Sequence, residues 1–164
     1  MNKIDEALSI QSLQYLVTDL KKHNKTIGFT HGAFDLFHAG HLHLLKEASK
    51  KCDFLIVGVD SDSMISQYKS VKRPIICEKD RVEIVNQIGV VGNAFVLNFD
   101  KPKDDYYAKL YSQLQIDKLF VGYNFAFLDR LKARTEEIGA KLNVIYGYRN
   151  HTSFIISKIL NSQS

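Results

Sequence analysis

Residues 30–41 read THGAFDLFHAGH, a segment in which a predicted strand ends, the chain turns at Gly32 and a helix begins near Gly40. The amino-terminal end of a helix offers unpaired N–H groups and partial positive charge to anions. Gly40 has no side chain, so a phosphate group can approach the backbone closely. His38 and His41 lie three residues apart, so both imidazoles can reach one phosphate group. The segment predicts a site for a polyphosphate. In the alternative interpretation, one histidine caps the helix and the other is a core residue with its hydrogen bonds satisfied.

Helical and strand-like apolar patterns alternate along the rest of the chain. Residues 54–59 (FLIVGV) are continuously apolar, as expected of a central parallel strand covered on both faces. The alternation predicts an α/β fold with a Rossmann-like, doubly wound parallel sheet in a single domain, 1–164, on which an N-terminal helix within 1–24 packs. The predicted strands are 25–30, 54–59, 94–97, 118–122 and 142–146, and the predicted helices are 9–23, 40–51, 81–88, 104–114, 128–138 and 152–160. Residues 66–78 are irregular and predict a loop over the sheet edge.

Composition excludes several classes of protein. The chain has 164 residues, 45% hydrophobic and 24% charged, which is typical of a globular domain rather than a disordered or fibrous one. The net charge of +4 is only mildly basic and no Lys/Arg run resembles a nucleic-acid arm, so an anionic small molecule explains the charge balance as well as a polyanion would, and we expect no nucleic-acid partner. Cys52 and Cys77 stand apart, which argues against a zinc site or a disulfide framework. Without a signal-peptide pattern or a run of transmembrane length, we expect a cytoplasmic protein with no membrane partner.

The motif around the two histidines resembles a known signature. GAFDLFHAGH is similar to the H-x-G-H segment of the cytidylyltransferase-like nucleotidyltransferases, and the longer pattern T-x-G-x-F-D-x-x-H-x-G-H is more specific than H-x-G-H alone. Further segments that resemble the family are GVDSD (58–62), KSVKRPIICEKDR (69–81), VGYNF (121–125) and HTSFIISKI (151–159). The N-terminal helix also looks like the one that leads the adenylyltransferase domain of ADP-heptose synthases.

The resemblance implies a reaction in which a phosphorylated acceptor attacks the α-phosphorus of a nucleoside triphosphate and pyrophosphate leaves. Such a reaction requires positioning and fixed positive charge rather than a nucleophilic side chain. The implied catalytic residues are His38, His41 and Lys72. The implied nucleotide-binding residues are Thr30, Ala33, Phe34, Gly40, Arg81, Asn124, Thr152 and Ser153. Lys69 and Asp35 are the remaining candidates, for the acceptor or its phosphate, although Asp35 is better suited to fixing the turn.

Each of these assignments has a plainer alternative. Lys69 and Lys72 can be solvated loop lysines, and Arg81 can be an exposed helix residue. Thr152 and Ser153 can serve as a helix N-cap, which is compatible with phosphate binding at the same helix end. No protein metal site is expected; Mg²⁺ is the expected cofactor, held mainly by the triphosphate itself.

Two departures from the family pattern concern specificity. His151-Thr152-Ser153 stands where the family has a Ser-Thr-Thr triplet, and His31 stands where Asn or Tyr is common, which affects the acceptor pocket. The N-terminal helix and Arg73-Pro74-Ile75 favour ATP and a sugar phosphate; synthesis of a CDP-alcohol from CTP is the alternative. A homodimer is an open alternative to a monomer.

Three other classes of protein are alternatives to a nucleotidyltransferase. A catalytically silent nucleotide-binding module would most simply have lost His38 or His41, and both are present. A Rossmann oxidoreductase would carry G-x-G-x-x-G after the first strand, which is absent. A fragment of a class I aminoacyl-tRNA synthetase would need a surface for tRNA that is not evident in this chain.

Overall fold

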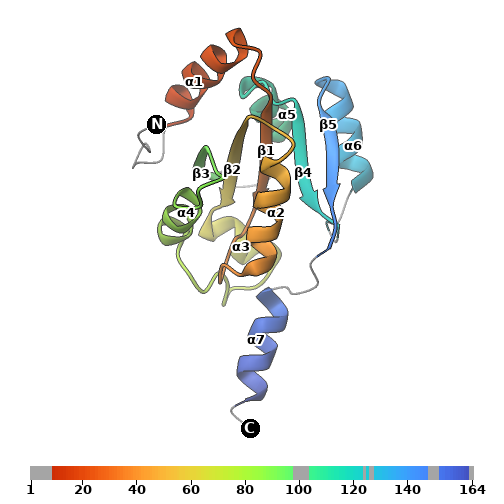
Figure 1. Cartoon of the computed structure of the whole chain (residues 1–164). Coiled ribbons are helices and arrows are strands. Elements are labelled where there is room, and N and C mark those ends of the chain that lie inside the picture. Colours follow the sequence, from red (N-terminus) through yellow and green to blue (C-terminus); the bar gives the residue numbers. More distant parts are fainter. Residues whose placement is uncertain (1–8, 98–103, 124, 126–127, 148–151, 163–164) are drawn as a thin grey trace.

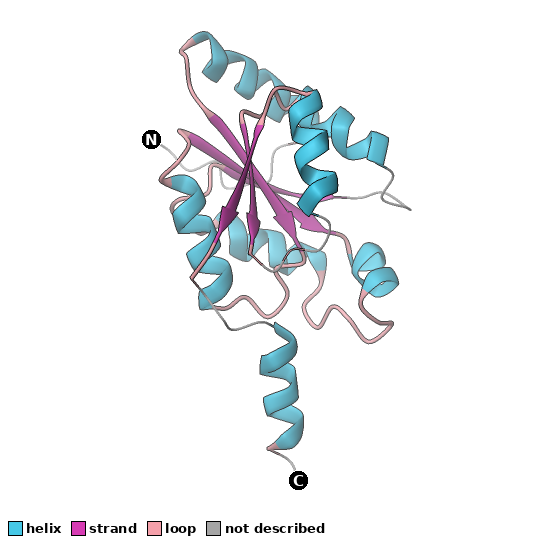
Figure 2. Ribbon diagram, turned by 90° about the vertical axis from the view of Figure 1, so that its right-hand side faces the viewer, coloured by secondary structure: helices cyan, strands magenta, loops and turns pink. Residues whose placement is uncertain are grey.

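The structure, a computed structural model, describes residues 9–97, 104–123, 125, 128–147 and 152–162. It confirms the predicted single α/β domain with a parallel sheet covered on both faces (Figures 1 and 2). The strands are β1 (Ile27–Gly32), β2 (Phe54–Asp60), β3 (Asn93–Leu97), β4 (Lys118–Gly122) and β5 (Lys141–Ile145). The helices are α1 (Ile10–Lys22), α2 (Ala39–Ser49), α3 (Asp62–Tyr68), α4 (Glu78–Asn86), α5 (Asp104–Gln113), α6 (Leu128–Glu137) and α7 (Thr152–Asn161).

The strand order β3-β2-β1-β4-β5 places β1 at the centre of the sheet. β1 pairs in parallel with β2 over its whole length, from Ile27–Phe54 to Gly32–Val59, and with β4 on its other side. The chain first builds the sheet outward from β1 to β3, then crosses back to β4. This reversal leaves a crevice at the carboxyl ends of β1 and β4, the usual place for a ligand in an open α/β sheet.

Two apolar clusters fill the space between the sheet and its helices. One lies between the sheet and α1, α3, α5 and α6, with Phe29 and Tyr111 fully buried in it. The other lies under α2 and α4, with Leu45 and Phe120 fully buried. Successive residues of a strand point to opposite faces, so β2 and β4 each contribute to both clusters. The sheet is therefore a rigid platform for the crevice at its rim.

Polar contacts at the opposite rim of the sheet, where the strands begin, hold α1 to the sheet. Ser9 caps α1 by accepting a hydrogen bond from the Ser12 N–H. At the other end of the helix, Lys21 forms an ion pair with Asp117, whose second oxygen accepts the Ile27 N–H at 2.6 Å. One carboxylate thus joins the end of α1 to the first residues of β1 and β4.

The structure corrects some of the predicted boundaries. Helix α3 was not predicted; Ser61 starts it by accepting the Met64 N–H, and it occupies the first part of the segment expected to be irregular. The loop is therefore residues 69–77, and its hydrogen bonds to Asp35 place it over the end of the central strand rather than over the sheet edge. Helix α4 begins at Glu78, three residues earlier than predicted, because acidic Glu78 and Asp80 suit a first helical turn.

Helix α7 extends away from the sheet below the strand ends (Figure 1). Among the described residues, no helix combines the length and the apolar character needed to cross a membrane.

Gly28 offers a test of packing at the centre of the sheet. A Cβ at this position would lie 2.5 Å from the Cys52 Sγ and 2.7 Å from the Phe120 ring. We expect Gly28→Ala to lower the free energy of unfolding by about 2 kcal/mol, because a close-packed core resists added volume. Urea unfolding measures this. At Gly89, where no other atom lies within 4 Å of an added Cβ, the matched Gly89→Ala change should cost less than about 0.5 kcal/mol; equal losses would contradict the packing argument.

Candidate active site

A cavity of about 500 Å³ opens at the carboxyl ends of β1 and β4, where the strand order reverses. Its walls come from the end of β1, the start of α2, the ends of β4 and β5, and the start of α7. The lining residues are His31, Gly32, Ala33, Phe34, His38, Gly40, His41, His43, Leu44, Lys69, Gly122, Tyr123, Phe125, Ile145, Thr152 and Ser153. The site therefore lies where the fold and the sequence motif both predict it.

His38 and His41 cap the amino-terminal end of α2. The His38 Nδ1 accepts the Gly40 N–H at 3.0 Å, and the His41 Nδ1 accepts the His38 N–H at 3.4 Å. The two rings stack with centroids 3.9 Å apart, and Phe34 and Phe37 flank the His41 ring. A nitrogen that accepts an N–H carries no proton, so the proton of each neutral imidazole is on Nε2. Each ring is thus set as an Nε2–H donor.

This capping arrangement refines what the motif predicts. The Gly40 N–H is already used by His38, so the imidazoles, rather than this amide, are the donors suited to phosphate. Protonation of either ring at Nδ1 would break a cap bond. The site therefore presents two Nε2–H donors at the positive end of a helix.

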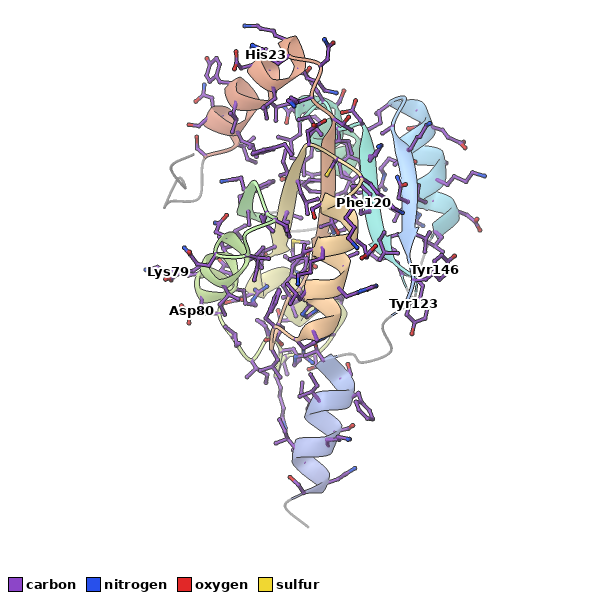
Figure 3. The ribbon with its side chains drawn as sticks, in the orientation of Figure 1. His23, Lys79, Asp80, Phe120, Tyr123 and Tyr146 are labelled. Carbon is purple, nitrogen blue, oxygen red and sulfur yellow. The ribbon has the colours of Figure 1, made fainter. Side chains whose placement is uncertain are left out.

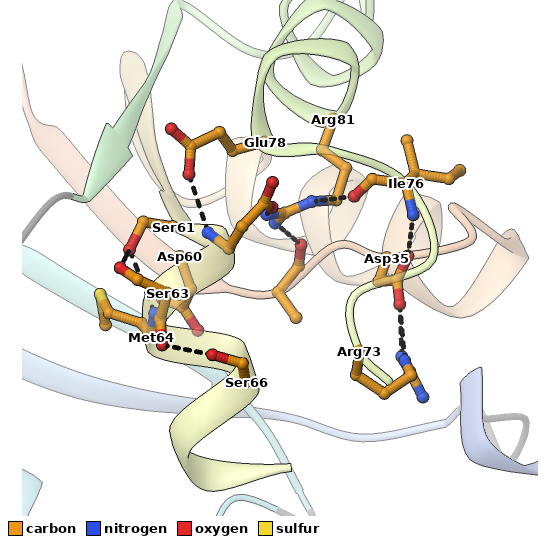
Figure 4. A network of polar contacts seen from close by, with 12 residues as sticks. Asp35, Asp60, Ser61, Ser63, Met64, Ser66, Arg73, Ile76, Glu78 and Arg81 are labelled. Carbon is orange, nitrogen blue, oxygen red and sulfur yellow. Dashed lines mark hydrogen bonds and ion pairs between the residues drawn. The ribbon is translucent and has the colours of Figure 1, made fainter. Parts of the chain in front are cut away.

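Asp35 is the centre of the polar network beside the cavity (Figure 4). Its buried carboxylate accepts the N–H groups of Ile75 and Ile76 at 3.0 to 3.1 Å and the Arg73 Nε–H at 2.8 Å. Burial alone would raise the pKa of Asp35, but the hydrogen bonds from Ile76, Ile75 and Arg73 outweigh this effect and hold the pKa below its usual range. Asp35 fixes the turn and the loop, the role to which the sequence suited it better, and it does not line the cavity.

Arg81 is fully buried and holds the same turn from the other side. Its guanidinium donates to the carbonyl oxygens of Ala33 and, at 2.8 Å, Ile76, and forms an ion pair with Asp62 at 2.6 Å. The structure corrects the alternative that Arg81 is an exposed helix residue. The assignment of Arg81 to nucleotide binding stays a prediction. Its charge is neutralised inside the protein, and it anchors the loop.

The start of α7 is joined to the same turn. The Thr152 hydroxyl donates to the Asp35 carbonyl oxygen at 2.9 Å, so its hydrogen is used within the protein. Thr152 is buried, whereas Ser153 is exposed, and both line the cavity. Of the two hydroxyl donors predicted for phosphate, the Ser153 hydroxyl is thus the one at the surface of the cavity.

The two loop lysines differ in position. Lys69 follows α3 directly and lines the cavity, whereas Lys72 is exposed and does not line it. Partial desolvation, followed by the nearby Arg73 charge, lowers the pKa of Lys69. Of the two lysines, Lys69 is the one that the structure brings to the cavity, and the catalytic role of Lys72 stays a prediction.

Other predicted residues divide between the cavity and the interior. Ala33, Phe34 and Gly40, which the sequence assigned to nucleotide binding, line the cavity. Thr30, assigned to the same role, is fully buried and does not belong to the cavity wall. Asn124 lies outside the described residues.

The sequence interpretation missed several residues of the cavity wall. His43 lies one turn into α2, and its Nε2 donates to the Tyr146 carbonyl oxygen at 2.8 Å, which ties α2 to the end of β5. Tyr123 and Phe125 follow β4, and the Tyr123 and Tyr146 rings stack with centroids 6.3 Å apart (Figure 3). The position of these residues in the sequence could have indicated them, because residues that follow parallel strands meet at the same rim of the sheet.

His31 and Asp60 form a buried pair at the ends of β1 and β2. The His31 Nδ1 lies 3.8 Å from one Asp60 oxygen, and the two side chains are 8% and 7% exposed. The other Asp60 oxygen accepts the Tyr68 hydroxyl at 2.7 Å. Desolvation, followed by the Asp60 charge, raises the pKa of Tyr68, so the phenol keeps the proton that it donates.

Comparison with known proteins agrees with the geometry. A family model described as cytidylyltransferase-like matches residues 29–161. The bifunctional protein HldE of Helicobacter pylori strain HPAG1 is 34% identical over 150 residues, which are 92% of this chain and 31% of that protein. The bifunctional protein HldE of Pseudomonas fluorescens strain SBW25 is 31% identical over 158 residues, which are 95% of this chain and 32% of that protein. The chain thus spans about a third of the length of these relatives.

Solved structures show the same fold. The lipopolysaccharide core biosynthesis protein of Thermoplasma volcanium GSS1 superposes with a TM-score of 0.65 at 27% identity, over 76% of this chain and 99% of that one. Pantoate-beta-alanine ligase of Francisella tularensis has a TM-score of 0.66 at 18% identity, over 88% of this chain and 67% of that one, and shares the fold alone. The fold and the histidine pair define a nucleotidyltransferase. The chain belongs to the cytidylyltransferase-like family.

The Asp35 network predicts a pH-dependent stability. A carboxyl whose pKa is lower in the folded state stabilises the fold above its unfolded pKa, here 3.8, and this stabilisation is lost as pH falls through the folded value. We expect Asp35→Asn to lower the free energy of unfolding by about 3 kcal/mol at pH 7, because it leaves Arg73 without its charge partner.

Urea unfolding at pH 7, 5, 4 and 3 measures both effects. The difference between the wild-type protein and Asp35→Asn should shrink as pH falls below about 4. Exposed Asp80 supplies the control, because Asp80→Asn should leave the pH dependence of stability almost unchanged. A difference that stays constant down to pH 3 would contradict the role of the Asp35 charge.

Proposed function

We propose that the chain transfers a nucleoside monophosphate from ATP to a phosphorylated sugar or similar small molecule and releases pyrophosphate. One observation carries the proposal: the paired Nε2–H donors of His38 and His41 stand at one wall of a cavity whose other walls include Lys69 and the start of α7. Donors and positive charge converging from separate elements suit a polyphosphate.

The reaction needs no covalent intermediate on the protein. An oxygen of the acceptor's phosphate forms a bond to the α-phosphorus, and the bond from that phosphorus to the β-bridging oxygen breaks. The electron pair leaves with pyrophosphate. Negative charge builds on the non-bridging oxygens, where the imidazole donors of His38 and His41 would stabilise it.

The other cavity residues would hold the two substrates in line. Lys69 is suited to neutralising the triphosphate or the acceptor's phosphate, at the edge of the fixed loop. Ser153 and the first N–H groups of α7 are suited to the β- and γ-phosphates, since the start of this helix lines the cavity. The Thr152 hydroxyl would keep α7 in place through the Asp35 carbonyl.

Magnesium would enter as part of the nucleotide substrate. Among the cavity residues that the structure describes, the oxygen donors are hydroxyl and carbonyl groups and none is a carboxylate. Within the described ranges, no cluster of three His, Cys, Asp or Glu residues could hold a metal ion. The donor set fits Mg²⁺ coordinated by phosphates better than Mg²⁺ in a protein cage.

Two tyrosines provide a surface for the nucleobase. Tyr123 is 39% exposed at the end of β4, and Tyr146 is 69% exposed just after β5. Their stacked rings stand beside the cavity (Figure 3), and such rings offer flat apolar faces to a base. Stacking alone would favour a purine through its larger area. The N-terminal helix and Arg73-Pro74-Ile75 of this chain resemble segments of ADP-heptose synthases. This resemblance also supports ATP as the nucleotide and a sugar phosphate as the acceptor.

Cytidylyl transfer is the second candidate. The matched family is described as cytidylyltransferase-like, which favours CTP and a product such as a CDP-alcohol. A silent nucleotide-binding module is less well supported, because both histidines are present and are held as donors by their cap bonds. Nucleotide selectivity and pyrophosphate release separate these possibilities.

The role of His41 predicts a large effect on turnover. We expect His41→Ala to lower kcat at least about a hundredfold, because it removes a donor that acts on charge developing in the transition state. Pyrophosphate release from ATP or CTP, with a panel of sugar phosphates, measures this. His23 lies on the opposite side of the molecule (Figure 3), and His23→Ala should keep wild-type turnover. A folded His41→Ala variant with normal kcat would contradict the proposal.

Nucleotide choice can be measured without knowing the acceptor. We expect ATP with Mg²⁺ to raise Tm more than CTP, GTP or UTP, because a ligand that binds only the folded state stabilises it by mass action. Thermal unfolding at matched nucleotide concentrations reports this. The preference for ATP should weaken in Tyr123→Ala and persist in Lys79→Ala, whose side chain lies far from the cavity (Figure 3). A larger shift with CTP would favour the cytidylyltransferase alternative.

A further inference from the structure

His43 joins the start of α2 to the chain that follows β5. Its Nε2 lies 2.8 Å from the Tyr146 carbonyl oxygen. A carbonyl oxygen can only accept a hydrogen bond, so the Nε2 of His43 carries the proton and donates it. His43 also lines the cavity, together with the cap histidines of the same helix. The bond therefore connects two walls of the candidate active site.

Gly147 lets the backbone pass close to the His43 ring. Its φ of +109° lies in the region that favours glycine, and a Cβ at this position would lie 3.4 Å from the His43 Nε2. A side chain here would be strained and would crowd the imidazole. The hydrogen bond and the glycine are separate features of the chain, and both serve the same contact between α2 and the segment after β5.

The contact fixes the chain at the place where it leaves the sheet. β5 lies at the edge of the sheet, paired with β4 along one side, and the Tyr123 N–H donates to the Ile145 carbonyl oxygen at 3.0 Å. The hydrogen bond from His43 extends this hold by one residue, to Tyr146. The Tyr146 ring lies nearly parallel to the Tyr123 ring, at 24° with centroids 6.3 Å apart (Figure 3). The place of the tyrosine pair thus depends on the backbone that His43 holds.

Helix α2 connects this contact rigidly to the phosphate donors. His43 follows His41 by two residues, which is about 3 Å along the axis of an α-helix. The imidazole donors and the tyrosine pair are therefore held by one element. A nucleoside triphosphate carries its base and its α-phosphate at the two ends of a ribose. A site that contacts both ends binds more tightly when their spacing is set before the ligand arrives.

We propose that His43 is a positioning residue for the nucleotide. Through the Tyr146 carbonyl oxygen it holds the tyrosine pair at the distance from the cap histidines that a nucleoside requires. This inference rests on the proposed nucleotidyl transfer and on the tyrosine surface proposed for the base. His43 acts through the backbone of Tyr146 and takes no part in the phosphoryl step. Without its hydrogen bond the triphosphate would still bind, but the base would be held more weakly.

The test compares substitutions on both sides of the contact that leave the cap histidines intact. His43→Leu removes the donor and keeps an apolar side chain of helical preference. His43→Gln keeps an N–H donor at the end of a side chain of similar reach. Gly147→Ala disturbs the contact from the backbone side. The matched control is His23→Leu, on the opposite side of the molecule (Figure 3).

Calorimetry with Mg²⁺ gives Kd for ATP, for CTP and for inorganic tripolyphosphate, and steady-state kinetics give kcat and KM. We expect His43→Leu to raise Kd and KM of the preferred nucleotide about fivefold to tenfold, the factor that one neutral hydrogen bond gives. The kcat and the acceptor KM should change less than about twofold. Tripolyphosphate has no base, so its Kd should stay the same. His43→Gln should recover most of the loss, and Gly147→Ala should act in the direction of His43→Leu.

A double-mutant comparison separates positioning from a general structural role. When Tyr123→Ala and Tyr146→Ala have already removed both rings, His43→Leu should raise the nucleotide Kd by less than about twofold, because the changes act on the same contact. Additive losses, or an equal loss for tripolyphosphate, would overturn the inference, as would an unchanged nucleotide Kd in a folded His43→Leu variant. In those cases pyrophosphate release by the wild-type protein still supports nucleotidyl transfer. If the wild-type protein binds no nucleotide and releases no pyrophosphate, both proposals fail.

Discussion

The hydrogen bonds to Asp35 are the interaction on which the rest of the site depends. One buried carboxylate holds the loop of residues 69–77 through two backbone N–H groups and Arg73, while its carbonyl oxygen receives the Thr152 hydroxyl from α7. Arg81 holds the same turn by donating a hydrogen bond to the Ala33 carbonyl oxygen. Three segments that are far apart in sequence therefore meet at the end of β1, and Lys69 and Ser153 reach the cavity only because that junction is fixed. The cost of burying the charge is offset by its complete set of partners.

The two cap histidines show how secondary structure can set the state of a functional group. Each Nδ1 accepts a backbone N–H at the start of α2, so each ring presents its hydrogen at Nε2. The same bonds satisfy helix N–H groups that would otherwise need water. Capping and the proposed phosphate binding, which looked like alternatives for these residues in the sequence, are thus compatible, because they would use opposite sides of one ring.

The sequence predicted most of the fold and the core of the site, for reasons that the structure explains. The apolar run of β2 and the H-x-G-H segment carry strong local signals, and both are found where expected. The burial of Arg81, Thr30 and Asp35 could not be predicted from the sequence, in which an arginine that binds phosphate looks like one that pairs with Asp62. The choice between Lys69 and Lys72 depends on where α3 ends, and α3 itself is too short to give a clear periodic pattern. The contact between His31 and Asp60 depends on strand pairing, which no local motif encodes.

The central position of β1 also determines how motion is distributed around the cavity. Its backbone is hydrogen-bonded to β2 along its length and to β4 on its other side, and Ile27 and Phe29 are fully buried in one of the two apolar clusters. Amide hydrogens in such a strand exchange with solvent only through large openings of the domain, whereas those of a surface loop exchange through small local ones. The floor of the cavity, formed at the end of this strand, therefore belongs to the part of the domain that opens least often.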